Sequence, residues 1–350
     1  MTQDQPQVTT APAPHQAAAP AQALVLQRLI LPDPAISTET ELFVHLEGPA
    51  VLRLATSELT FAPGGAARFD SYMNLLNLGN WQRHCALDGL WLRLAGTGRF
   101  GLRIWQCRDA GLDETTVFED VVTLAPEGTD FDLSALLPGA RPGLVMVALT
   151  ALTEGELTGG AFVTRPPETA EPLRLMVSIT TFRREAEVAQ TLARMTRFLD
   201  GPGAALLARA GAQVDLCLVD NGQSARPAPH PRLRVIPNAN LGGAGGFARG
   251  LAAAQDSGAT HCLFMDDDAS FQMENLVRSL AFLRLARSPR AALAGAMISA
   301  GRKWAMWENG AVFDRFCRPQ YLGTDLRDPD EVAQMELAAA GPRPPGFYGG

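Results

Sequence analysis

The chain has 350 residues, of which 47% are hydrophobic and 19% are charged, and its formal net charge is −7. This composition is too apolar for a disordered protein and argues against nucleic-acid binding through overall positive charge. With no secretory signal and no run of about 18 apolar residues, the sequence predicts a cytoplasmic protein of roughly two domains and no membrane span.

The first half of the chain has the pattern of a β domain. Residues 1–22 are rich in Ala, Pro and Gln and are expected to form a disordered leader. Residues 23–164 contain many short β-like stretches between Gly and Pro turns, which predicts an all-β sandwich or jelly-roll domain. A hairpin is expected over residues 90–107, with its turn at Gly96-Thr97-Gly98. Three tryptophans are expected in the core rather than in a sugar-stacking surface: Trp81, Trp91 and Trp105.

The second half has a different periodicity. A Pro-rich linker, residues 165–172, precedes a region 173–350 in which apolar runs alternate with helical patterns. Such alternation predicts an α/β domain with a doubly wound, mostly parallel sheet, whose ligands bind at the carboxyl ends of the strands. The expected strands are residues 173–182, 214–222, 233–238, 261–269 and 291–299.

Three adjacent carboxylates, Asp266-Asp267-Asp268, follow the apolar strand that ends at Met265. They repel one another unless a cation neutralises them, and their oxygens suit Mg²⁺ or Mn²⁺. We therefore favour a metal site that bridges phosphate groups over a solvated acidic turn that caps the next helix.

Two earlier strand ends carry further polar residues. The first expected strand ends in TTFRR, which contains Thr180 and Arg184, and the second ends at Asp220. Together they offer a cation and a carboxylate for a nucleotide, although each is also common in an ordinary turn or cap.

A glycine-rich loop runs from Asn238 into the next expected helix. Gly243, Gly245 and Ala248 match the dinucleotide fingerprint, and Asp266 follows at a suitable distance. However, the fingerprint belongs in the first strand–helix turn, and a ribose requires a single acid. An NAD-dependent oxidoreductase is therefore the less favoured alternative, and the glycines are expected to let the backbone approach a ligand.

Past the fifth expected strand lies a cluster that includes Trp304, Trp307, Glu308 and Asp314. An aromatic face can stack on a sugar, and a carboxylate can bind hydroxyl groups. A β-hairpin with a buried tryptophan explains the same residues almost equally well.

Several motifs, taken in order, resemble a known family: VSITTFRRE, VDNG, NANLGGAGGFARGL, FMDDDA and WENGAVFD. They are similar to family-two glycosyltransferases with a GT-A fold and, more narrowly, to the bacterial galactofuranosyltransferases that polymerise galactan. The segment FDSYMNLLNLGNWQR resembles part of their N-terminal β domain. The resemblance covers about residues 24–350 and implies an α/β GT-A domain, residues 173–350, after a β-sandwich domain, residues 23–164.

The resemblance implies an inverting transfer of galactofuranose from UDP-galactofuranose to a lipid-linked galactan. Asp266 and Asp268 match the carboxylates that bind Mn²⁺ or Mg²⁺ in the DxD motif, and Trp307 and Glu308 match the sugar or acceptor side. The donor-binding set that we expect is Thr180, Arg184, Asp220, Asn240, Gly243, Asp266 and Asp267. Another UDP-hexose and a non-catalytic glycan-binding module remain alternatives.

The family's catalytic base and a metal-binding histidine lie further downstream, so we expect both beyond Gly350, expect the chain to be a fragment, and leave the base unassigned. A lipid-linked acceptor implies a peripheral location at the inner face of the membrane. The helix expected over Glu274–Ser288 has arginines beside leucines, but we favour an ordinary packing helix over a lipid-facing one. A homo-oligomer is compatible with the sequence.

Overall fold

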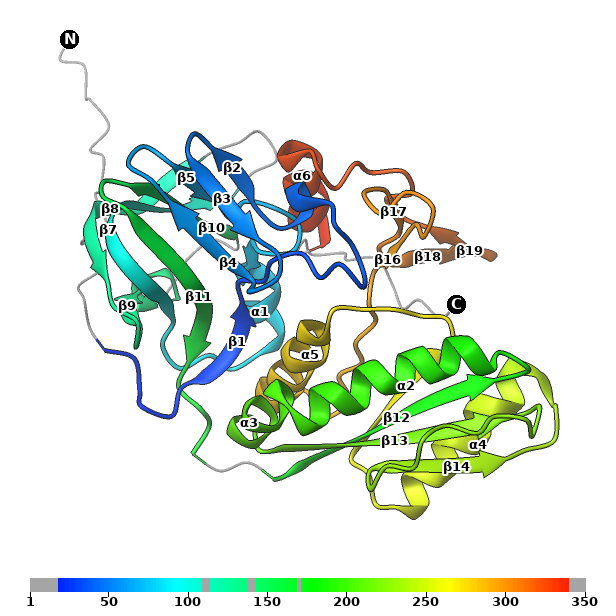
Figure 1. Cartoon of the computed structure of the whole chain (residues 1–350). Helices are drawn as coiled ribbons and strands as arrows, with labels where there is room; N and C mark the ends of the chain where they lie inside the picture. The colour runs from blue at the N-terminus through cyan, green and yellow to red at the C-terminus, as the bar shows by residue number, and fades with distance from the viewer. Residues whose placement is uncertain (1–17, 109–113, 138–142, 169–170, 340–350) are drawn as a thin grey trace, which may run out of the picture. The chain divides into compact units, whose positions relative to one another are not determined.

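The computed structural model describes residues 18–108, 114–137, 143–168 and 171–339 (Figure 1). These residues divide into two compact units. The antiparallel unit comprises the described residues up to Arg165 together with those from Ala286 onward, and the parallel unit comprises Pro166–Leu285. Most of the expected leader lies outside the described residues.

The antiparallel unit is built around one large sheet. Eleven described strands belong to it, and its main path runs in the order β2-β5-β10-β7-β11-β4-β3. β1 pairs with β11, β6 with β10, and β8 and β9 with β7, always antiparallel. The strands are β1 Leu24–Arg28, β2 His45–Glu47, β3 Ala50–Arg53, β4 Glu58–Phe61, β5 Ala66–Arg68, β6 Leu76–Asn77, β7 Trp91–Cys107, β8 Glu114–Leu124, β9 Thr129–Asp132, β10 Leu144–Ala151 and β11 Gly155–Thr164. Short helices lie between them: η1 Thr40–Leu42, α1 Leu78–His84 and η2 Ser134–Leu136.

The expected hairpin over residues 90–107 is wrong, because β7 is one continuous strand of 17 residues. Its first part pairs with β9 and β11, and its second part pairs with β8 and β10. Gly98 has a φ of +105°, and a Cβ on Gly96 would lie 2.0 Å from the carbonyl oxygen of Glu156. These glycines therefore permit a bend and a close strand approach rather than a turn. The three tryptophans of this region are buried, which confirms the prediction of core packing: Trp81, Trp91 and Trp105.

The carboxyl-terminal part of the described chain completes the core of the antiparallel unit. Leu326, Val332 and Met335 are buried in one cluster with Phe43 and Trp105. The amide of Asn77 also donates to the carbonyl oxygen of Glu336, at 2.9 Å. The elements of this part are β16 Met297–Ile298, β17 Met306–Glu308, β18 Ala311–Asp314, β19 Phe316–Pro319 and α6 Pro329–Ala339.

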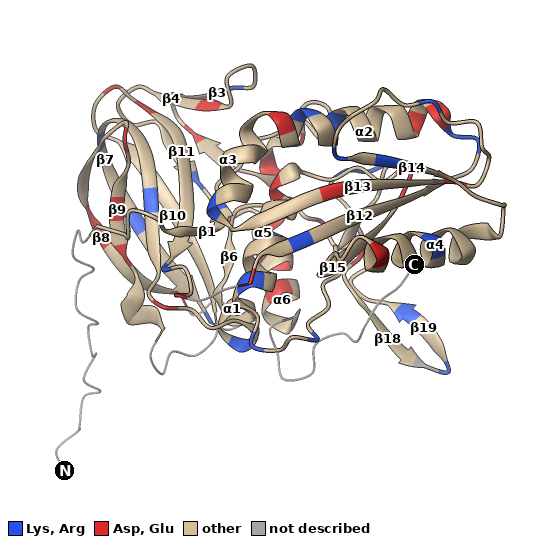
Figure 2. Cartoon of the chain, turned by 90° about the horizontal axis from the view of Figure 1, so that it is seen from below, with Lys and Arg blue, Asp and Glu red and all other residues tan. Residues whose placement is uncertain are grey.

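The parallel unit contains four described strands in the order β14-β13-β12-β15. Helices α2, α3 and α5 share one buried cluster with the sheet, and α4 packs in a second cluster with residues of β12 and β13 (Figure 1). The apolar side of α2 is buried, while its charged residues mark the outer side (Figure 2). The elements are β12 Leu173–Thr181, α2 Glu185–Asp200, α3 Pro202–Arg209, β13 Ala212–Asp220, β14 Leu233–Pro237, α4 Gly242–Asp256, β15 His261–Asp266 and α5 Met273–Leu285.

The expected fold class, an α/β GT-A domain over residues 173–350 after a β sandwich, is wrong for this chain. The described chain is mostly antiparallel β, and only four of its strands are parallel. The stretch 291–299 does not extend the parallel sheet, since only Met297–Ile298 forms a strand, which pairs antiparallel with β17. Alanine and glycine dominate residues 291–296, and such small residues have low β propensity and little apolar surface to bury.

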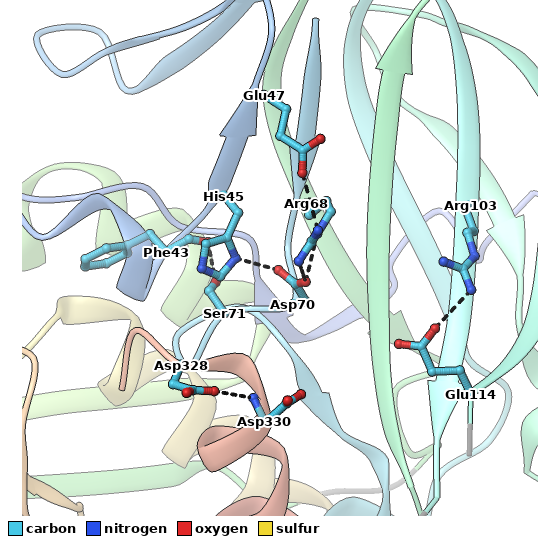
Figure 3. A network of polar contacts seen from close by, with 10 residues as sticks. All are labelled: Phe43, His45, Glu47, Arg68, Asp70, Ser71, Arg103, Glu114, Asp328 and Asp330. Carbon is cyan, nitrogen blue, oxygen red and sulfur yellow. Dashed lines mark hydrogen bonds and ion pairs between the residues drawn. The ribbon is translucent and has the colours of Figure 1, made fainter. Parts of the chain in front are cut away.

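A partly buried polar network, centred on the buried Asp70, links β2 and β5 in the antiparallel unit (Figure 3). Nδ1 of His45 lies 2.7 Å from Oδ1 of Asp70, and Nε of Arg68 donates to Oδ2 of Asp70 at 2.9 Å. The hydrogen bond to Asp70 raises the pKa of His45 against the opposing effect of burial. Burial alone would raise the pKa of Asp70, but the hydrogen bonds and charges of His45 and Arg68 outweigh it and lower that pKa. The network is therefore strongest when His45 is protonated and Asp70 is ionised.

We expect the free energy of unfolding of the antiparallel unit to fall as the pH rises above 6.5, the unperturbed pKa of histidine. A raised folded-state pKa gives stability that is complete below the unfolded value and is lost as the pH passes the folded value. His45→Gln should remove this loss. Urea unfolding at about pH 6 and about pH 9 can be followed by tryptophan fluorescence, because all five tryptophans belong to this unit.

His84→Gln is the matched control for this experiment. Burial lowers the pKa of His84, so its contribution to stability has the opposite sign and is lost on acidification. The control should therefore keep the alkaline loss of stability. An equal loss in His45→Gln would show that the pair with Asp70 does not cause it.

Candidate functional site

The candidate site lies at the carboxyl edge of the parallel sheet. β12, β13 and β15 are adjacent, and their register pairs Thr181 with Asp220 and Thr180 with Asp266. The strand ends that the sequence singled out therefore meet at one edge, where parallel sheets bind their ligands.

Asp267 is the buried centre of the site. Its Oδ2 accepts a hydrogen bond of 2.7 Å from the hydroxyl group of Thr181, and its Oδ1 accepts one of 3.3 Å from Nη1 of Arg184. The same Nη1 also contacts Oδ2 of Asp268. Thr191 on α2 reaches the carbonyl oxygen of Asp267, at 3.4 Å. Asp267 thus ties the loop after β15 to β12 and α2.

The two flanking carboxylates are exposed. Desolvation raises the pKa of Asp266, and the charges of Asp268 and Asp267 add to this effect, while Arg184 opposes it. The neighbouring aspartates therefore make ionisation of Asp266 less favourable, and Arg184 supplies part of the compensating charge.

Asp220 shapes the loop after β13. Its Oδ1 accepts from the amide of Gly222 at 3.0 Å, and its Oδ2 accepts from the amide of Ala225 at 2.8 Å. The side chain is almost fully buried, so the structure shows it holding backbone in position beside the site.

The glycine-rich segment lies mostly inside helix α4, which begins at Gly242. Oδ1 of Asn240 accepts from the amide of Gly242 at 3.2 Å, and Gly243 is exposed. A Cβ on Gly246 would lie 2.2 Å from Cγ2 of Thr180. Gly246 therefore packs α4 against β12, and Thr180 faces that helix. Because the fingerprint residues lie within α4, after the third strand of the unit, the geometry does not favour dinucleotide binding.

Trp307 and Glu308 belong to the antiparallel unit, whereas the other candidate residues belong to the parallel unit. Both lie on β17, where Trp307 is 55% exposed and Glu308 is buried. Burial raises the pKa of Glu308, and its Oε1 has no hydrogen-bond partner among the described residues. The nearby Trp304 packs under Arg327, whose guanidinium carbon lies 4.0 Å from the ring centroid.

The sequence did not single out Thr181 or Thr191, although both contact Asp267. Thr181 follows Thr180, and successive side chains of a strand point to opposite faces of the sheet. This alternation is the one sequence signal that could have placed the two threonines on different faces of β12. Thr191 lies on α2, and no local sequence signal marks it.

The chemistry of the donor set fits a hard divalent cation. Mg²⁺ is usually bound by one or two carboxylates together with substrate phosphates, and Asp266 and Asp268 offer two exposed carboxylates. The described residues contain no group of three or more His, Cys, Asp or Glu side chains that could hold a metal ion by themselves.

Helix α5 packs as an ordinary core helix. Leu276, Leu280 and Leu285 are buried, and Arg284 donates to backbone carbonyl oxygens, including that of Ala210. In the part of the chain that the structure covers, no helix has both the length and the apolar character that crossing a bilayer requires.

No protein-family model matches the chain. It is 24% identical over 311 residues to the galactofuranosyltransferase GlfT2 of Mycolicibacterium smegmatis. This alignment covers 83% of this chain and 46% of that protein. It is also 25% identical over 303 residues to GlfT2 of Mycobacterium tuberculosis, in an alignment that covers 84% of this chain and 47% of that protein. These alignments indicate a relationship to galactofuranosyltransferases, and the chain spans about half the length of the curated relatives it matches.

Among solved structures, a family two carbohydrate esterase from Cellvibrio japonicus aligns with a TM-score of 0.22 and 11% identity, over 69% of this chain and 88% of that chain. A family 29 carbohydrate-binding module aligns with a TM-score of 0.24 and 10% identity, over 41% of this chain and 83% of that chain. At these TM-scores neither alignment indicates a shared fold.

Proposed function

We propose that this chain is part of an inverting, metal-dependent glycosyltransferase that moves galactofuranose from UDP-galactofuranose to a lipid-linked glycan at the inner face of the membrane. The observation that carries the proposal is the similarity to two galactofuranosyltransferases over more than four fifths of the chain. The strand-end cluster of Thr181, Arg184 and Asp267 supports it, because it lies where parallel sheets bind ligands.

In this proposal Asp266 and Asp268 would hold Mn²⁺ or Mg²⁺, and the ion would supply positive charge that stabilises the departing diphosphate. Arg184 binds the diphosphate as a cation, and Asp267 orients Arg184 from its buried position. Asp220 and Asn240 position the loops that contact the nucleotide. Trp307 and Glu308 bind the sugar or the acceptor. The base that activates the acceptor hydroxyl group is not assigned to a described residue.

The test is a calorimetric titration of UDP into the chain with and without Mn²⁺. We expect binding that requires Mn²⁺, and we expect the double variant Asp266→Ala/Asp268→Ala to lose at least about tenfold in affinity, since both cation ligands are removed. Asp256→Ala, on the exposed end of α4, is the control for a lost surface charge and should bind as the unmodified chain does.

Binding of UDP that is independent of Mn²⁺, or a preference for NAD, would contradict the proposal. Binding of polysaccharide without UDP would instead favour a glycan-binding module. Competition among UDP-galactofuranose and other UDP-hexoses then identifies the donor sugar.

A further inference from the structure

Arg184 contacts Asp268, one of the two carboxylates that are proposed to hold the cation. One nitrogen atom, Nη1, contacts both Oδ1 of Asp267 and Oδ2 of Asp268. Asp267 is buried and has a second partner in Thr181, whereas Asp268 is exposed. A ligand can therefore replace the contact between Arg184 and Asp268 without leaving a buried carboxylate unpaired.

The charges explain why the two cations compete. The three aspartates and Arg184 together carry a formal charge of −2. A divalent cation neutralises this charge, but one bound to Asp268 would lie beside the guanidinium group, and two like charges on one carboxylate repel each other. Cation binding at Asp268 and the contact between Arg184 and Asp268 therefore oppose each other.

We propose that Arg184 acts as a latch on Asp268: its guanidinium group is displaced from Asp268 when the cation binds there, and it then contacts the diphosphate of the donor. This inference rests on the proposed function. Without a nucleotide, the cation must displace the guanidinium group from Asp268 and binds weakly. With a diphosphate present, the released guanidinium group gains a new anionic partner, while Asp267 keeps it in place. Cation and donor therefore strengthen each other's binding through Arg184, and by linkage each does so by the same factor.

The test measures Mn²⁺ binding in the absence of nucleotide, by the electron paramagnetic resonance signal of the free ion. We expect Arg184→Gln to bind Mn²⁺ about tenfold more tightly than the unmodified chain, since a competing charge is removed from the site. In the presence of Mn²⁺, the same variant should bind UDP more weakly. The factor by which UDP strengthens Mn²⁺ binding should therefore shrink.

Arg183→Gln is the matched control. Arg183 adjoins Arg184 and carries the same charge, but it lies over the ring of Phe182, with its guanidinium carbon 5.1 Å from the ring centroid. Loss of its charge changes the field at the site without breaking a contact with Asp268. The control should therefore change Mn²⁺ affinity much less than Arg184→Gln does.

Mn²⁺ binding by Arg184→Gln that is equal to or weaker than that of the unmodified chain would overturn the latch proposal. Mn²⁺-dependent binding of UDP by the unmodified chain would still support the proposed function in that case. The same gain in affinity in Arg183→Gln would also overturn the latch proposal, because net charge alone would then explain the effect. If no variant binds Mn²⁺ and UDP binding does not depend on the ion, both proposals fail.

Discussion

Gly250→Ala should lower the free energy of unfolding of the parallel unit by about 1–3 kcal/mol, even though alanine favours a helix more than glycine does. A Cβ on Gly250 would lie 1.7 Å from the hydroxyl oxygen of Ser178 and 2.8 Å from its Cβ. Ser178 is fully buried on β12, and rotation of its hydroxyl group would leave its own Cβ at 2.8 Å, still closer than a normal van der Waals contact. Urea unfolding followed by helical circular dichroism measures the change, because most of the helical residues that the structure describes lie in this unit.

Gly243→Ala is the matched control on the same helix. The nearest atom to a Cβ there is Cε2 of Phe247, at 4.0 Å. The substitution should leave stability unchanged or raise it by up to about 1 kcal/mol, because alanine has the higher helix propensity. If Gly250→Ala folded with unchanged stability but lost UDP binding, the glycine would serve a ligand instead of the packing of α4 on β12.

Val332→Asp should destabilise the antiparallel unit by more than about 3 kcal/mol, because it buries a carboxylate without a partner. Val332 on α6 is fully buried in the cluster that contains Phe43 and Trp105. Tryptophan fluorescence during urea unfolding follows this unit directly, since all five tryptophans belong to it.

Gln334→Asp places the same carboxylate on the exposed side of α6 and should change stability by no more than about 0.5 kcal/mol. If Val332→Asp were as stable as this control, α6 would not belong to the core of the antiparallel unit. A large loss of unfolding free energy in both variants would mean that a new carboxylate destabilises α6 wherever it is placed, and not through burial.

Local pattern was sufficient to predict the parallel strands and the helix after the first of them. The apolar runs of β12, β13 and β15 and the helical spacing from Val188 to Leu199 occur where expected. Because parallel strands end at one edge, the meeting of the strand ends at Thr180, Asp220 and Asp266 also follows from the sequence. These features depend on residues close together in the chain, or on a rule of sheet geometry.

Contacts between residues far apart in the chain could not be predicted from the local sequence pattern. Gly96-Thr97-Gly98 has the chemistry of a hairpin turn, and only the approach of Glu156 explains why the strand continues. The arginine pair after β12 indicated a cation, but not that Arg184 would reach Asp268, 84 positions away.

The antiparallel unit is interrupted in sequence, since the chain leaves it at Arg165 and returns at Ala286. The return is marked by the amide of Arg287, which donates to the carbonyl oxygen of His84 at 2.8 Å. On the ribosome, all 120 residues of Pro166–Leu285 must therefore be made before α6 can cover Phe43 and Trp105. At a synthesis rate of about 5–20 residues per second, these 120 residues alone take about 6–24 seconds, so the apolar surface waits at least that long for its partner. Nascent chains stalled before Ala286 should consequently bind chaperones that recognise apolar surfaces, and chains extended past α6 should release them.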